Sequence, residues 1–188
     1  MAVKTMSMQT GAGLYNEGWH EVTIRQATQD VWKGSNGQSK TYVDLLFEGY
    51  TDNMNLRVFE VRNKETNEEF KLANLFRYAM AGIIEVLNDP TGKKPILQYD
   101  DDVTNLIGKN INAFIFKNQE GYNKFFDTIA PVEQEGEHYS FTADKVDALK
   151  VSAEKNFAKS NKSNHITNGT IPKGTPVTHT PSNEDIPF

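Results

Sequence analysis

The stretch that decides the fold is Trp19–Glu48, which reads WHEVTIRQATQDVWKGSNGQSKTYVDLLFE. In residues 19–29, β-branched and polar residues alternate, so that Val22 and Ile24 share one face. This alternation is typical of a half-buried strand. Asn36-Gly37 then supplies the two positive-φ residues that a hairpin turn prefers. The pattern predicts a strand that turns back on itself.

The returning strand is predicted over residues 40–48. Its core face is made of Val43, Leu45 and Phe47, because these residues alternate with more polar neighbours. A third strand fits residues 55–61, where Leu56 and Val58 share one side and Arg57 and Phe59 share the other.

The period of the apolar residues then changes. From residue 71 to residue 88 they recur at helical spacing, which predicts one amphipathic helix that ends in the turn residues 88–92. Two more strands follow over residues 109–117 and 122–129. The loop between them has Gly121 where a left-handed residue is needed.

Three strands, a helix and two strands form the element order of an OB-fold, a five-stranded, partly open Greek-key barrel. We therefore predict a mainly β domain of this type over residues 19–140. Such a barrel binds oligonucleotides on the face around its second and third strands and through two loops. In this chain the two loops are residues 32–40 and 117–122.

The segments that flank the barrel differ in composition. Residues 1–18 lack any sustained period and are predicted to be a flexible arm. Residues 141–159 have the spacing of a helix, either docked on the barrel or only marginally stable. Residues 160–182 are rich in Asn, Ser, Thr, Gly, Lys and Pro and predict a disordered linker.

The last six residues, 183–188, place acidic groups, a rigid proline and an aromatic ring beside the α-carboxylate. A partner pocket can take the ring while basic side chains hold the carboxylates. A simple solubilising end also fits this composition. The candidate partner-binding residues are Glu184, Asp185, Ile186, Pro187 and Phe188.

The ending Asp185-Ile186-Pro187-Phe188 resembles the acidic tip of bacterial and bacteriophage single-stranded DNA-binding proteins of the SSB type. The Gly108-Lys109 entry into the fourth strand and the aromatic last hairpin add to this resemblance. It implies a tip that recruits replication, recombination and repair proteins. The acidic run is shorter than the family often has, which implies weaker docking or other partners.

Composition limits the remaining function classes. The chain has 188 residues and no cysteine, so disulfides, thiolate metal sites and Cys nucleophiles are excluded. No run approaches the length of a membrane span and residues 1–18 lack the apolar core of a signal peptide, so we predict a cytoplasmic protein. Asp100-Asp101-Asp102 is interpreted as a cap for residues 103–107 rather than a metal site. We predict no enzyme activity, no cofactor and no metal.

The charge balance requires a local binding groove. Residues 1–140 carry 14 Lys and Arg against 20 Asp and Glu, a net charge of −6, and residues 141–188 carry +1. Such a domain repels DNA at long range. Single-strand binding then depends on aromatic faces that stack bases and on nearby cations that follow the phosphates.

Aromatic and basic residues alternate around the predicted groove. Each aromatic has core packing as its alternative role, and Trp32 and Tyr42 are the aromatics that the pattern favours for DNA contact. The candidate ssDNA-binding residues are Trp32, Lys33, Lys40, Tyr42, Arg57, Phe59, Arg62, Lys64, Phe116, Lys117, Tyr122 and Lys124.

Together these features predict a sequence-independent single-stranded DNA-binding protein, encoded by a phage, that coats DNA and recruits partners through its tip. A homo-oligomer is compatible with this role. Two alternatives stay open: an adaptor whose tip mimics a host SSB tail, and a single-stranded RNA binder.

Overall fold

The computed structural model describes residues 16–35, 37–87, 96–136 and 140–166, with side chains described through residue 159. Several predicted segments therefore lie outside the described residues. They are the arm up to residue 15, Asn36 of the hairpin turn, the turn at residues 88–92, the linker from residue 167 and the tip at residues 183–188.

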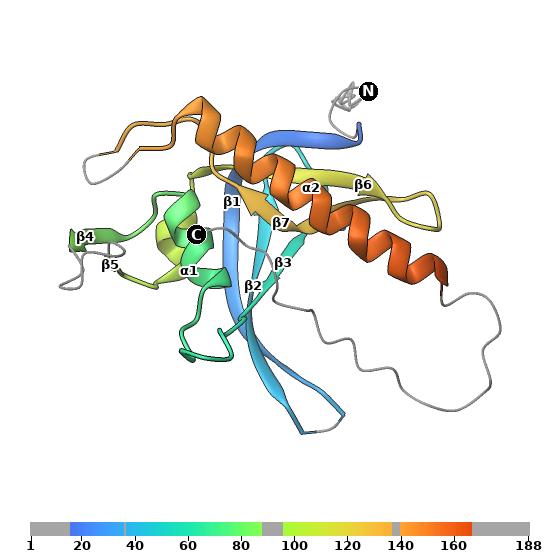
Figure 1. The fold of residues 1–188 in the computed structure, drawn as a ribbon, viewed down its shortest axis with the longest axis horizontal. Helices are drawn as coiled ribbons and strands as arrows, with labels where there is room; N and C mark the ends of the chain where they lie inside the picture. The colour runs from blue at the N-terminus through green and yellow to red at the C-terminus, as the bar shows by residue number, and fades with distance from the viewer. Residues whose placement is uncertain (1–15, 36, 88–95, 137–139, 167–188) are drawn as a thin grey trace, which may run out of the picture.

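The main sheet has five antiparallel strands in the order β3-β2-β1-β6-β7 (Figure 1). All five predicted strands are present, with ends that move by a few residues. The fourth of them lies beside the first, which is a Greek-key connection. Their bounds are Gly18–Lys33 for β1, Ser39–Phe47 for β2, Leu56–Phe59 for β3, Asn110–Lys117 for β6 and Asn123–Ala130 for β7.

Strand β1 holds the two halves of the sheet together. Its residues 18–23 pair with β6 and its residues 24–33 pair with β2. A bulge between Ile24 and Gln26 bends the strand where it changes partner. No ladder joins β3 to β7 in the described chain, so the sheet is open. The predicted mainly β, OB-like fold is confirmed, without closure into a barrel.

The core lies on the inner face of this sheet. Residues predicted to face inward are buried on β1, β2 and β3, so the alternation identified the buried face correctly. They are Val22, Ile24, Val43, Leu45, Phe47, Leu56 and Val58. From outside the sheet, Leu75, Phe76 and Leu106 join the same buried cluster.

The predicted long helix is wrong in its second half. Helix α1 covers only Lys71–Tyr78. Met80 has a φ of 47° and its N–H donates to the Arg77 carbonyl at 3.1 Å. The Ala81 N–H reaches back to the Phe76 carbonyl at 2.9 Å. This is the Schellman pair of hydrogen bonds, which ends a helix.

The chain beyond this end forms a hairpin. Strand β4, Ile83–Leu87, pairs with β5, Ile96–Tyr99, as a two-stranded sheet beside α1 (Figure 1). Gly82 makes the transition with a φ of 62°, and the Asp100 N–H donates to its carbonyl at 2.8 Å. The β-branched residues of β4 suit this extended conformation.

The predicted cap at Asp102 is confirmed. Val103–Leu106 form a short 3₁₀ helix, η1, and the Asp102 side chain accepts a hydrogen bond from the Thr104 N–H at 2.9 Å. The Thr104 backbone and hydroxyl donors lower the pKa of Asp102. The carboxylate is therefore accounted for as a helix cap.

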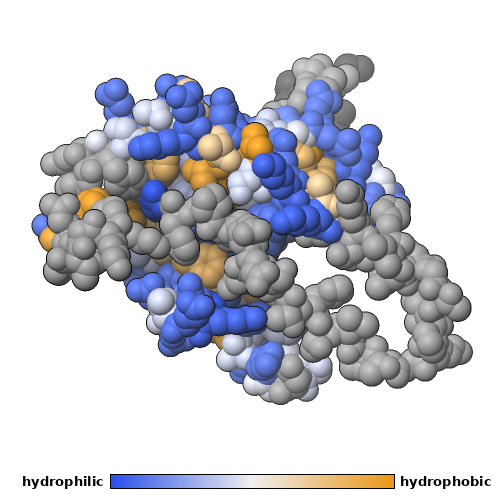
Figure 2. Space-filling view, in the orientation of Figure 1, coloured by the Kyte–Doolittle hydropathy of each residue, from blue (hydrophilic) through white to orange (hydrophobic). Residues whose placement is uncertain are grey.

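Helix α2, Ala143–Ile166, lies across β6 and β7 (Figure 1). The predicted helix is confirmed and is docked on the sheet. It continues through residues 160–166, where the composition predicts the start of the linker. Phe157 anchors it, with ring centroids 5.2 Å from Phe114, 5.3 Å from Phe116 and 4.9 Å from Phe126. Figure 2 shows hydrophilic residues interspersed with hydrophobic ones along the exposed side of α2.

In the part of the chain that the structure describes, the helices are too short or too polar to span a lipid bilayer.

Candidate nucleic-acid interface

Trp32, Tyr42, Arg57 and Phe59 gather on the outer face of β1, β2 and β3, and we call these four residues the outer cluster. The strand register explains the grouping, because Tyr42 pairs with Phe59 across β2 and β3. In the same way Trp32 pairs with Lys40 across β1 and β2. Side chains of one parity share one face of a sheet, so the residues opposite the core converge outside it.

The rings of the outer cluster pack in one edge-to-face pair and one tilted pair. Trp32 and Phe59 have centroids 6.4 Å apart at an interplanar angle of 85°. Tyr42 and Phe59 have centroids 5.5 Å apart at 53°. Trp32 is still 44% exposed, although an indole ring is large and apolar. The cluster therefore presents an aromatic surface to the solvent.

Arg57 is fixed above Tyr42, with its guanidinium carbon 4.2 Å from the ring centroid. Asp44 holds the guanidinium from the side, accepting from Nε at 2.8 Å and from Nη2 at 2.7 Å. The hydrogen bond to Asp44 raises the pKa of Arg57, so the group stays charged. Burial, then the nearby Asp30 carboxylate, raise the pKa of Tyr42 and keep its phenol neutral.

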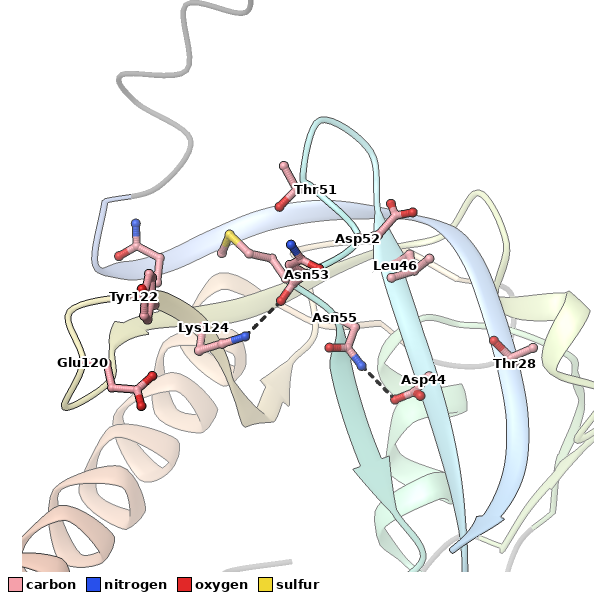
Figure 3. A pocket seen from close by; sticks show the side chains of 12 residues that line it. Thr28, Asp44, Leu46, Thr51, Asp52, Asn53, Asn55, Glu120, Tyr122 and Lys124 are labelled. Atoms are coloured by element: carbon pink, nitrogen blue, oxygen red, sulfur yellow. Dashed lines mark hydrogen bonds between the residues drawn. The ribbon is translucent and has the colours of Figure 1, made fainter.

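A groove of about 890 Å³ lies beside the outer cluster. Figure 3 shows the side chains that line it. Asp44 connects the two, because it lines the groove while it binds Arg57. The turn before β3 and the loop between β6 and β7 also line the groove. Its lining residues are Thr28, Asp44, Leu46, Thr51, Asp52, Asn53, Met54, Asn55, Glu120, Tyr122, Asn123 and Lys124.

The β6–β7 loop forms the far wall of the groove. The Asn118 side-chain oxygen accepts from the backbone N–H groups of Glu120 and Tyr122, at 3.1 and 2.8 Å. Gly121 has a φ of 83°, as the turn prediction requires. Tyr122 is 64% exposed on this loop. Lys124 reaches across to donate to the Asn53 carbonyl at 3.0 Å (Figure 3).

Two of the acidic residues that line the groove are paired with arginines, Asp44 with Arg57 and Asp52 with Arg25. Arg62 pairs with Glu60 just after β3, outside the groove lining. Lys33, Lys40 and Lys64 are exposed and form no ion pair with another described residue. Locally, the surface therefore offers cations to an anionic ligand even though the chain carries a net charge of −5.

The structure brings together only some of the predicted site residues. The outer cluster, Lys40, Tyr122 and Lys124 lie on or beside the groove surface. The other basic candidates are exposed at the ends of strands or in turns, where no groove contact is described. They are Lys33 at the end of β1, Arg62 and Lys64 after β3, and Lys117 at the end of β6.

Phe116 is not part of this surface. It packs beneath α2, with ring centroids 6.2 Å from Phe126 and 5.3 Å from Phe157. Phe116 therefore takes the alternative role that the sequence allows for each aromatic residue, which is packing in the core. The assignment of Phe116 to the groove is therefore corrected, and the physical reason is that α2 covers the face of β6 on which Phe116 lies.

Polar groove residues were missed by the sequence reasoning. Asp44 is the most important of them, since it orients Arg57 and also accepts from the Asn55 side-chain amide at 3.1 Å (Figure 3). A signal existed: Asp44 has the outward parity of Tyr42 in the same strand. Asn53 lies in the turn before β3, whose path the sequence pattern does not specify, and Asn55 directly precedes β3 although the pattern predicts it as the first residue of that strand.

Comparison with known proteins adds no relative to this picture. The chain matches no protein-family model and no curated protein. Within the described residues there is also no group of three or more His, Cys, Asp or Glu side chains placed to hold a metal ion.

Proposed function

We propose that this protein binds single-stranded DNA without sequence preference and has no catalytic activity. The observation that carries the proposal is the outer cluster beside a groove whose lining includes Tyr122 and Lys124. Aromatic faces stack bases of any sequence, and cations beside them follow the phosphates. This surface is on the strand 2–3 face of an OB-like sheet, where that architecture binds oligonucleotides.

The aromatic character of the surface favours single strands over duplex. Bases are free to stack on Trp32 or Tyr122 only when they are not stacked and paired within a double helix. The acidic domain also lacks the broad positive surface that supports tight duplex binding through phosphates alone. We therefore propose that the protein coats exposed single strands during replication and recombination, in a bacterial cytoplasm infected by the phage that encodes it.

A titration with labelled oligo-dT tests this function. We expect oligo-dT to bind at least tenfold more tightly than a duplex of equal length, with an affinity that falls as salt rises because counterions are released. Fluorescence anisotropy at several salt concentrations measures both. Equal or absent binding to the two DNAs would contradict the proposal and favour the adaptor, whereas stronger binding to oligo-rU would favour the RNA binder.

We further propose that Glu184–Phe188 recruits partner proteins. Support comes from the resemblance of Asp185-Ile186-Pro187-Phe188 to SSB-type tips, since these residues lie outside the described part of the chain. The acidic groups and the terminal ring suit a pocket with basic residues around it.

Deleting residues 184–188 is expected to abolish binding to a recombination or repair protein that recognises SSB tails. Affinity for oligo-dT should stay equal or rise, because the deletion removes negative charge. Surface plasmon resonance with the full-length and shortened chains measures the first effect, and the oligo-dT titration measures the second. Equal capture of the partner by both chains would exclude the tip as the recruiting element.

A further inference from the structure

We propose that Arg57 contacts a base by stacking, not a phosphate by ion pairing, and that Asp44 is the positioning residue that fixes the guanidinium plane for it. This inference rests on the proposed single-strand binding. It gives Arg57 a role different from that of the exposed lysines around the groove.

The Arg57 guanidinium is placed so that a base can stack on it. The guanidinium carbon of Arg57 lies over the Tyr42 ring, 4.2 Å from its centroid, while 40% of the arginine side chain remains exposed. A base therefore cannot stack on that face of the Tyr42 ring. A guanidinium that rests on an aromatic ring presents a second flat surface to solvent, and nucleic-acid bases stack on such planes. Tyr42, Arg57 and a base would then form a continuous stack.

Two of the hydrogen-bond donors of Arg57 are already engaged by Asp44. Its Nε donates to Asp44 Oδ1 at 2.8 Å and its Nη2 donates to Asp44 Oδ2 at 2.7 Å. This fork is the geometry that an arginine uses to bind a phosphate with two hydrogen bonds. Asp44 already fills it, so a phosphate must either displace Asp44 or use the remaining N–H groups.

The charge of Arg57 is balanced by that of Asp44. Asp44 and Arg57 together carry no net charge, so an approaching phosphate gains little from the pair and meets a carboxylate beside it. A stacking contact does not depend on net charge in this way. Asn55 adds to the positioning, because its amide donates to Asp44 Oδ1 at 3.1 Å and limits the rotation of the carboxylate.

Two matched substitutions test the role of Asp44. Asp44→Asn is compared with Asp127→Asn. Asp127 pairs with Lys71 at 2.6 Å and is not among the groove-lining residues, so each change removes one paired carboxylate but only Asp44→Asn alters the groove. We expect Asp127→Asn to bind oligo-dT equally or up to about twofold more tightly, because the negative charge of the domain falls. We expect Asp44→Asn to bind about fivefold more weakly, because Arg57 loses its fixed plane.

Arg57→Lys separates stacking from charge without touching Asp44. Lysine keeps the positive charge but has no plane, so affinity for oligo-dT should fall about fivefold while the slope of log K against log salt stays that of the wild type. Thermal unfolding of each variant confirms that the fold is retained. A lost structural contact alone would lower the unfolding midpoint without this specific combination of lower affinity and unchanged slope.

The proposal is overturned if Arg57→Lys binds oligo-dT as tightly as the wild type, or if Asp44→Asn binds it equally or more tightly, as is expected of Asp127→Asn. In either case Arg57 acts as an ordinary phosphate contact or takes no part in binding. A wild-type protein that fails to bind oligo-dT at all would instead refute the proposed function, so the two failures are distinguishable.

Discussion

Replacing Gly82 by alanine is expected to destabilise the protein by about 3 kcal/mol. A side chain at a φ of 62° costs about 1–2 kcal/mol because Cβ crowds the following carbonyl group. The added Cβ would also lie 2.3 Å from the Asp100 carbonyl oxygen, a backbone atom that cannot rotate away. Overpacking of this kind costs about 1–3 kcal/mol more.

Gly108→Ala provides the matched control. Gly108 has a φ of 78°, but no atom lies within 4 Å of an added Cβ. Its substitution should therefore show only the conformational cost, about 1–2 kcal/mol. Chemical denaturation of both variants measures the difference. Equal losses would show that the Asp100 carbonyl yields freely and that the β4–β5 hairpin is not fixed by this contact.

Gly82 also shows where prediction from the sequence reached its limit. The apolar stripe of residues 71–79 is real, and Leu75, Phe76 and Ala79 are buried as the helical spacing requires. Beyond it, Ile83, Val86 and Leu87 continue the same spacing by coincidence, because apolar residues of a short strand fit more than one period. Helix α1 ends at Tyr78, and Met80, two residues further on, adopts the left-handed conformation that usually belongs to glycine. The glycine that usually signals the end of a helix is therefore missing from this position.

The candidate site was predictable to the extent that strand parity determines it. Trp32, Tyr42, Arg57 and Phe59 meet because alternation places them opposite the core, and this could be deduced without coordinates. Phe116 has the same outward parity on β6, yet α2 covers it. Parity identifies a face of a sheet, whereas only tertiary packing decides whether a helix, solvent or a ligand covers that face.

Replacing Trp32 by alanine is expected to weaken binding to oligo-dT by about tenfold or more. Stacking of one base on an aromatic side chain is worth about 1–3 kcal/mol. The Trp32 indole is 44% exposed and is the most exposed ring of the outer cluster. The loss should appear with little change in stability, since Trp32 touches Phe59 only at its edge, with centroids 6.4 Å apart.

Val31→Ala is the control for this substitution. Val31 is 47% exposed and precedes Trp32 in β1, so its side chain points to the opposite face of the strand. Anisotropy titrations should show wild-type affinity for Val31→Ala, a tenfold loss for Trp32→Ala and an intermediate value for Trp32→Phe, which keeps a smaller ring. Wild-type affinity in all three variants would mean that the bases stack elsewhere, most simply against Tyr122 in the groove lining. A loss in Val31→Ala equal to that in Trp32→Ala would instead indicate that the end of the hairpin, rather than the indole, contributes the binding energy.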